Sequence, residues 1–402
     1  MRKSLKISIS SILAVLIFIT QFTSLAYFPW YNMLRYGTII LLGVYVGRRI
    51  RIVLQKKYLL VNLMVLIFSF LTVYTSYFNR SRLGDRDPFL ASIPFTASLI
   101  LFLLFMEIRA ENGLVNSTIT VFYKTAFALA IITDILIFFV PSLFMTYHQY
   151  FVGTKFRVVY LHLLLIVLYL TRNPIEEIKG YKRIPLLLLF TWSFFIGIRV
   201  NCSTGIVGVI VLLILIFIIN EREKLFLSGE FYCLVQALCF VFVFFYELVL
   251  GNPTVEHIIV NYLGRDITLT SRTRIYMRVP IILTERDGWM QGMGYGSSYD
   301  LGMRYGGFPD TQNGILEWIW QVGIPTTIIM VLMFAIILTV AKKHTYYRNR
   351  KALLPLIAGA YLFTVLGTVE ITIGIMYFSL MICIMCVATD TYKEKNTVLF
   401  KD

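Results

Sequence analysis

Apolar runs long enough to cross a membrane recur along almost the whole of this chain. A helix of about 20 apolar residues spans the hydrocarbon layer of a bilayer and satisfies its own backbone hydrogen bonds there. The chain is 58% hydrophobic and 15% charged, with a mean hydropathy of +0.76. Soluble domains are nearer ~45–50% apolar and ~25% charged. The sequence therefore predicts an all-α, polytopic membrane protein.

These runs predict about twelve transmembrane helices. Their ranges are 8–27, 34–47, 59–78, 89–106, 120–143, 158–171, 184–200, 204–220, 231–250, 314–340, 352–368 and 371–389. A region with the first nine helices (1–250) is followed by a large polar loop (251–313). The last three helices and a tail follow (314–402).

The Lys and Arg residues indicate the orientation of these helices. With the N-terminus inside, 24 of the 37 basic residues lie on inside segments, 7 on short outside segments and 6 on the long loop. Short cytoplasmic loops are enriched in Lys and Arg, so both termini are predicted to be cytoplasmic and the long loop extracytoplasmic. Topology thus accounts for most of the net charge of +15, and nucleic-acid binding is not indicated.

The longest polar interval, from Gly264 to Gly323, carries six arginines and no lysine. A guanidinium group binds phosphate through two parallel hydrogen bonds and stays charged at any useful pH. The interval therefore indicates an anionic ligand such as a pyrophosphate, although a solvated loop with surface ion pairs is the alternative. Four apolar residues recur in it at near-helical spacing and predict an amphipathic helix on the outer surface: Ile275, Val279, Ile282 and Leu283. Pro280 is expected to bend or break that helix.

Ionisable residues in apolar spans are usually functional or paired. Asp134 lies near the middle of the fifth span, Glu247 near the end of the ninth, and Glu370 between the last two. Asp134 is either a proton relay of a transporter or a hydrogen-bonded structural group, and the second reading is favoured. The chain shows no cysteine pattern, P-loop, dinucleotide fingerprint or HExxH sequence, so we expect no metal and no cofactor.

Three motifs follow one another on the outer side of the membrane. They are Thr270–Tyr276 (TSRTRIY), Gly292–Gly296 (GMGYG) and Asp310–Glu317 (DTQNGILE), with Gly323 closing the series. This order resembles the O-antigen ligase and Wzy-type polysaccharide polymerase superfamily. Two further segments are similar to parts of that family, the first of them to capsule and exopolysaccharide polymerases of Gram-positive bacteria: Gly153–Tyr160 and Ser203–Gly208. The resemblance implies a GT-C-like architecture, with short helices in the large outer loop.

Two departures from the family pattern are informative. Gln312 stands where the family often has histidine, and glutamine cannot accept a proton as a general base. Ser203 and Thr204 stand where ligases and many polymerases have Ser-Arg, with Arg199 one turn away. The missing histidine favours a polymerase over a ligase.

The resemblance implies a metal-independent transfer in the outer leaflet of a bacterial plasma membrane. A hydroxyl of one undecaprenyl-pyrophosphate-linked repeat unit attacks the anomeric carbon of another, and undecaprenyl pyrophosphate leaves. Further partners would be membrane lipid, a flippase and a chain-length regulator. The candidate residues for holding pyrophosphate or glycan are Arg272, Arg274, Arg199, Lys155, Arg157, Tyr160 and Glu317. The candidates at the reacting centre are Asp310 or His148 as base, with Gln312 and Asn313 beside them.

Two other functions remain open. A ligase of the same superfamily would join a finished glycan to a different acceptor. A transporter or flippase of lipid-linked oligosaccharide would make no bond, and its charged residues would follow a path through the bilayer. Here the charged residues are concentrated at one outer face, which favours the polymerase.

Overall fold

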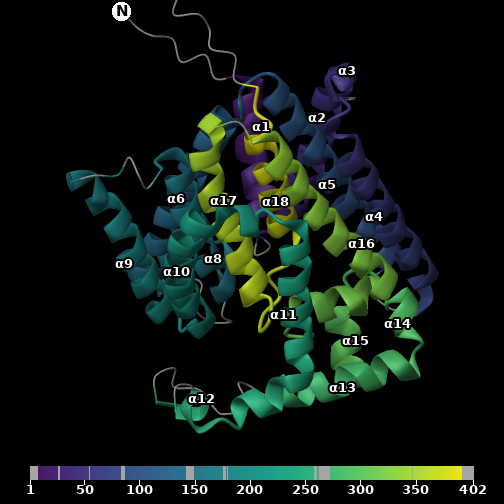
Figure 1. Cartoon of the computed structure of the whole chain (residues 1–402). Coiled ribbons are helices and arrows are strands. Elements are labelled where there is room, and N and C mark those ends of the chain that lie inside the picture. The colour runs from purple at the N-terminus through teal and green to yellow at the C-terminus, as the bar shows by residue number, and fades with distance from the viewer. Residues whose placement is uncertain are drawn as a thin grey trace, which may run out of the picture.

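The computed structural model describes residues 8–25, 28–53, 55–82, 87–141, 149–174, 178, 180–257, 260–261, 272–345 and 347–391. Most of these residues are helical (Figure 1). The β structure within the described ranges is one antiparallel hairpin of β1 (Gln149–Tyr150) and β2 (Gly153–Thr154). The hairpin leads directly into a helix.

Each of the ranges predicted to cross the membrane contains a helix. In chain order these are α1 (Ile9–Ile17) with the π-helical segment η1 (Phe18–Phe22), α2 (Tyr31–Gly47), α4 (Leu59–Phe78), α5 (Pro88–Glu111), α6 (Val115–Phe139), α8 (Lys155–Arg172), α9 (Arg183–Arg199), α10 (Ser203–Phe226), α11 (Gly229–Leu250), α16 (Gly314–His344), α17 (Tyr347–Leu366) and α18 (Ile375–Ala388). Six helices of the described ranges are long and apolar enough to cross a membrane: α4, α5, α6, α10, α11 and α16. The prediction of an all-α membrane protein is confirmed at this level.

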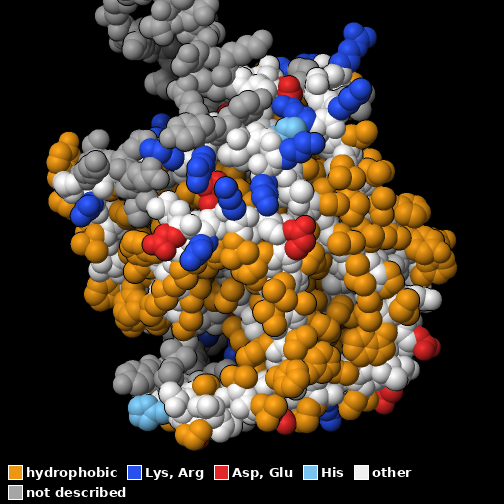
Figure 2. Space-filling model, in the orientation of Figure 1, with side chains coloured by type: hydrophobic (Ala, Val, Ile, Leu, Met, Phe, Trp, Pro, Cys, Tyr) orange, Lys and Arg blue, Asp and Glu red, His pale blue; other side chains and the backbone are white. Residues whose placement is uncertain are grey.

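The helices α18 and α8 lie in the interior of the bundle. Every residue of α18 from Met376 to Ala388 is buried, as is α8 from Val158 to Leu168. The outer helices present their large apolar side chains to the surroundings, and Figure 2 shows these side chains as a belt around the middle of the molecule. Lys and Arg side chains gather above this belt.

Short helices cover the opposite end of the bundle (Figure 1). They are α12 (Pro253–His257), α13 (Arg272–Glu285), α14 (Gly288–Gln291) and α15 (Ser298–Tyr305). On α13 the four apolar residues predicted to form one face are all buried, so the amphipathic helix is confirmed. Pro280 lies inside α13 and does not end it.

A break in α16 fixes how this end is built. Gly323 adopts φ 79° and ψ 169°, and Pro325 follows it. A proline has no N–H with which to bind the carbonyl one turn earlier, so the break leaves carbonyl groups without helical partners. The turn Gly292–Gly296 supplies those partners, since Met293 N–H donates to the Trp320 carbonyl at 2.7 Å and Gly294 N–H to that of Gln321 at 2.9 Å.

The glycines of that turn are needed because the backbone of α16 approaches the turn closely. Gly292 has φ +66°, and a Cβ atom there would lie 2.5 Å from the Gln321 carbonyl oxygen. The GMGYG motif is therefore a backbone brace for α16.

Candidate functional site

A buried ion pair joins two segments that are far apart in the sequence. Arg272 Nη2 lies 2.7 Å from Glu370 Oε1, and the two residues are 8% and 6% exposed. Arg272 is the first residue of α13, and Glu370 lies in the connection between α17 and α18. Thr204, near the start of α10, donates to the same Glu370 oxygen at 3.4 Å. Three parts of the chain thus meet at one carboxylate.

The position of α13 is fixed by a tyrosine one turn further along. Tyr276 donates its hydroxyl to two backbone carbonyls, that of Gln312 at 2.9 Å and that of Thr368 at 3.2 Å. Tyr276 and Arg272 lie on the same face because residues four apart on a helix are neighbours. The guanidinium group is therefore held by a helix that is clamped to both adjoining loops.

Asn313 organises the same region from the α16 side. Its side-chain oxygen caps α16 by accepting from the Ile315 and Leu316 N–H groups, each at 3.0 Å. Its amide nitrogen donates to the carbonyls of Cys239 on α11, at 3.2 Å, and of Thr368, at 3.1 Å. Both ends of this side chain are used in positioning, so Asn313 is a positioning residue.

Asp310 and Gln312 form a local unit in the connection before α16. Gln312 has φ 54° and donates to Asp310 Oδ1 from its backbone N–H at 3.1 Å and from its side-chain amide at 2.5 Å. Burial raises the pKa of the Asp310 carboxyl, while these hydrogen bonds and the charge of Arg272 oppose that rise. Gln312 therefore orients an acidic group within electrostatic reach of Arg272.

Lys155, Arg157 and Tyr160 reach the site from the start of α8. The charge of Lys155 acts on Glu370, and its ammonium group donates to the Asn201 carbonyl at 3.2 Å. The Tyr160 hydroxyl is buried without a hydrogen-bond partner in the described part of the chain. The charges of Glu370, Arg157 and Arg272 all act on that hydroxyl. Tyr160 thus links the Arg272 pair to Arg157.

A further basic residue lies near Arg157. The charges of Arg35 and Arg157 act on both Tyr31 and Tyr295, and burial raises the pKa of Tyr295 to about 12 against their influence. Tyr295 is the tyrosine of the GMGYG motif. Figure 2 shows basic side chains at the back of a hollow between α12 and the bundle. The end of the bundle that carries α13 therefore holds at least three buried or half-buried basic groups near one another.

Sequence reasoning gave no role in the site to two of these residues. Glu370 was recognisable as an acidic residue between two apolar spans, where a charge is costly without a partner. Its partner was not, because Arg272 lies far away along the chain. Arg35 carried a weaker signal, that of a lone basic residue on an outer segment.

Other predicted site residues lie apart from this cluster or serve another purpose. Arg274 and Arg199 are exposed, and the Arg199 guanidinium lies 5.8 Å from the centre of the Phe138 ring. His148 lies outside the described residues.

Glu317 holds several segments together through its hydrogen bonds. It is buried and accepts hydrogen bonds from Ser298, from the Thr311 hydroxyl at 2.9 Å and from the Gln321 amide at 2.6 Å. These contacts join α15, the Asp310 loop and the first turns of α16. The carboxylate is therefore engaged in holding the outer loop together, rather than being available to a glycan.

Asp134 is hydrogen-bonded inside the bundle. Its two oxygens contact His162 Nε2 at 3.1 Å and Trp192 Nε1 at 2.7 Å, which joins α6 to α8 and α9. These contacts favour the structural reading over a proton relay.

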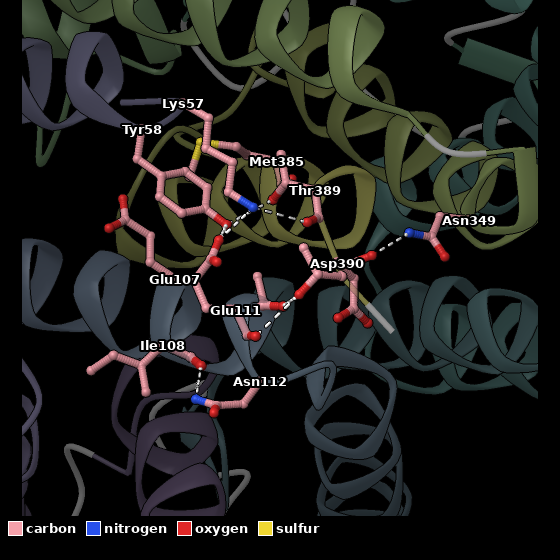
Figure 3. A network of polar contacts seen from close by, with 12 residues as sticks. Lys57, Tyr58, Glu107, Ile108, Glu111, Asn112, Asn349, Met385, Thr389 and Asp390 are labelled. Atoms are coloured by element: carbon pink, nitrogen blue, oxygen red, sulfur yellow. Dashed lines mark hydrogen bonds and ion pairs between the residues drawn. The ribbon is translucent and has the colours of Figure 1, made fainter. Parts of the chain in front are cut away.

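A second polar network ties the helices at the other end of the bundle (Figure 3). Lys57 pairs with Glu111, and the Tyr58 hydroxyl lies 3.0 Å from Glu111 and 3.2 Å from Thr389. Asn349 donates to the Asp390 carbonyl at 3.2 Å. The partners are already engaged with one another, so this network clamps α4, α5, α17 and α18 together.

Comparison with models of protein families finds no match, and comparison with curated proteins finds none either. Within the described ranges, no group of three His, Cys, Asp or Glu side chains is arranged to hold a metal ion. The side chains that the described site offers are a buried arginine paired with a carboxylate, with further basic groups and tyrosines around it.

Proposed function

We propose that this protein is a polymerase that joins undecaprenyl-pyrophosphate-linked oligosaccharide repeat units on the outer face of a bacterial plasma membrane. Its chain would cross the membrane twelve times, with both termini in the cytoplasm. The observation that carries the proposal is the buried Arg272–Glu370 pair, at the end of the bundle covered by α13. Lys155 and Arg157 of α8 and Arg35 of α2 support the proposal, because they add positive charge near this pair.

An arginine paired with a carboxylate can exchange that partner for a phosphate. Burial raises the pKa of Glu370 to about 7, even though the charge of Arg272 lowers it. An arriving pyrophosphate would displace the carboxylate from the guanidinium group, and Glu370 would remain ionised and able to accept a proton. Arg272 would then bind a pyrophosphate through two parallel hydrogen bonds, which are stronger in a site from which water is excluded.

The same pair can serve both halves of the transfer. The acceptor hydroxyl oxygen forms a bond to the anomeric carbon of the donor, and the bond from that carbon to the pyrophosphate oxygen breaks. The electron pair leaves with the pyrophosphate, and Arg272 stabilises its charge. The hydroxyl proton goes to Glu370, whose hydrogen bonds from described residues are all at Oε1. Glu370 is thus a further candidate for the base, beside Asp310 and His148.

Substitution of Arg272 by lysine tests this proposal. Arg272→Lys keeps the charge and removes the forked geometry, so we expect most polymer formation to be lost while the protein still accumulates in the membrane. Arg304→Lys is the control, because Arg304 is exposed on α15 and outside every motif. A surface substitution of this kind changes stability by about 0.5 kcal/mol or less.

The readout is polymer length on a gel, scored beside the single repeat unit. An inactive polymerase leaves single repeat units on lipid or cell wall. A flippase without activity would remove outer glycan of every length, and a ligase without activity would leave finished polymer on its lipid carrier. A wild-type ladder from Arg272→Lys would remove the reason for placing the donor pyrophosphate at this residue.

A further inference from the structure

A lateral apolar groove runs between α11 and α16. Its cavity volume is about 410 Å³. Phe240 of α11 and Ile315, Ile319, Ile328, Val331 and Leu332 of α16 are among the residues that line it. A cavity of this size is sufficient for a stretch of hydrocarbon chain and lies within the usual range for ligand sites.

We propose that this groove holds the polyprenyl chain of the lipid-linked glycan, with its pyrophosphate at Arg272. The inference rests on the proposed function and extends it from the charged end of the substrate to its hydrocarbon end.

The groove is continuous with the candidate site. Ile315 lies two residues after Asn313, and Phe240 follows Cys239, whose carbonyl accepts from the Asn313 amide at 3.2 Å. The same amide donates at 3.1 Å to the carbonyl of Thr368, which lies two residues before Glu370. The end of the groove nearest to α13 therefore adjoins the segment that contacts Arg272. A ligand with an anionic head and an apolar chain matches this sequence of charged and apolar surfaces.

The polar residues of the groove direct their hydrogen bonds into the protein. The Gln236 amide donates to the Tyr232 hydroxyl at 2.5 Å, and its oxygen is buried. The Thr327 hydroxyl donates to the Gly323 carbonyl at 2.8 Å. A sugar in the groove would find few partners, whereas a hydrocarbon chain loses nothing there. The occupant favoured by these contacts is a hydrocarbon.

The groove extends along α16 on both sides of the break at Gly323. Ile315 and Ile319 belong to the part of α16 before the break, and Ile328 to Leu332 belong to the part after it. The interval from 315 to 332 corresponds to about 25 Å of helix at ~1.5 Å per residue. Several isoprene units would fit along such a length.

Photo-crosslinking of the full-length protein in nanodiscs tests the inference. The probe is a polyprenyl pyrophosphate with a diazirine on its isoprenoid chain, and the labelled peptides are mapped by mass spectrometry. We expect labelling of α11 and α16 that unlabelled polyprenyl pyrophosphate displaces and phosphatidylglycerol does not. Labelling spread over all lipid-facing helices, or displaced equally by both lipids, would overturn the inference and indicate ordinary lipid.

A matched pair of substitutions on α11 sharpens the test. Ala237→Trp fills the groove, whereas Leu238→Trp adds the same side chain at an exposed position outside the lining. We expect labelling to fall at least tenfold in the first variant and to stay unchanged in the second. Ile328→Trp serves as a second groove-filling variant if Ala237→Trp fails to accumulate.

The outcomes separate this inference from the proposed function. Unchanged labelling in both groove variants, together with loss of polymer in Arg272→Lys, would show that the polyprenyl chain does not bind in this groove. The polymerase proposal would be unaffected by that result. Failure of the protein to bind the probe at all would count against both.

Discussion

Glu370 is subject to opposing influences at close range. Burial raises its pKa to about 7, the charge of Arg272 lowers it, and the charge of Asp310 raises it again. Thr204 and Lys155 favour the ionised form. The charge of Glu370 also acts on the hydroxyl groups of Tyr160 and Tyr276. A carboxylate balanced in this way changes its charge near neutral pH.

The rate of polymer formation should therefore depend on pH through Glu370. A base works only when ionised, so we expect the rate in proteoliposomes to rise between about pH 6 and pH 8. Glu370→Gln cannot take the proton, and we expect a loss of about 10²- to 10⁴-fold. A Gln variant that keeps both the rate and the rising limb would exclude Glu370 as the base.

Glu317 should matter for stability rather than for substrate. Glu317→Ala leaves the Thr311 hydroxyl and the Gln321 amide without their buried acceptor, at a cost of about 2–4 kcal/mol. We expect a lower unfolding temperature of the detergent-solubilised protein. Glu285→Ala is the control, since Glu285 is exposed at the end of α13. Equal unfolding temperatures for the two variants would contradict a stabilising role for the hydrogen bonds of Glu317.

At the level of single residues, sequence reasoning found the arginine and missed its carboxylate. Arg272 was recognisable from a motif and from the chemistry of guanidinium groups. Its pairing with Glu370 depends on how α13 lies over the bundle, which local sequence does not specify. Glu317 belongs to a motif as well, but only its buried partners reveal that it is structural.

At the level of elements, α16 is interrupted where its carbonyls are bound by the GMGYG turn. We expect Gly323→Ala to destabilise the protein, because alanine is strained at φ +79° and its Cβ would lie 2.2 Å from the Met290 carbonyl oxygen. Thermal unfolding and polymer length are the measurements. Gly37→Ala is the control, since an added Cβ there meets nothing within 4 Å. Unchanged stability in Gly323→Ala would mean that the break is not required.

The existence of α16 and of the glycine turn could be predicted from the sequence, but their relation could not. Hydropathy shows an apolar run, and the glycines indicate a tight turn. That the turn satisfies the carbonyls freed by the break follows only from the contact between two separate segments. Hydropathy likewise cannot tell α18, which is buried by other helices, from a helix that faces lipid.

At the level of the whole molecule, the charge bias predicts that the end bearing α13 faces outward. Single cysteines at positions 56, 344 and 291 test this on a background from which the five native cysteines have been removed. We expect an impermeant thiol reagent to label the cysteine at 291 in intact cells and to leave those at 56 and 344 unlabelled. The reverse pattern would invert the topology.

The Arg272–Glu370 pair also has a consequence for biosynthesis. Residues of a growing chain enter the membrane in sequence order, and Glu370 comes close to the end of the described chain. Until α17 and α18 have been inserted, Arg272 lacks this carboxylate and the α8 groups lack the neighbours that complete the cluster. A chain stalled or truncated before residue 370 would thus lack the Arg272–Glu370 pair on which the proposed polymerase depends. The connection between α17 and α18 completes a cluster whose other residues all precede it in the chain.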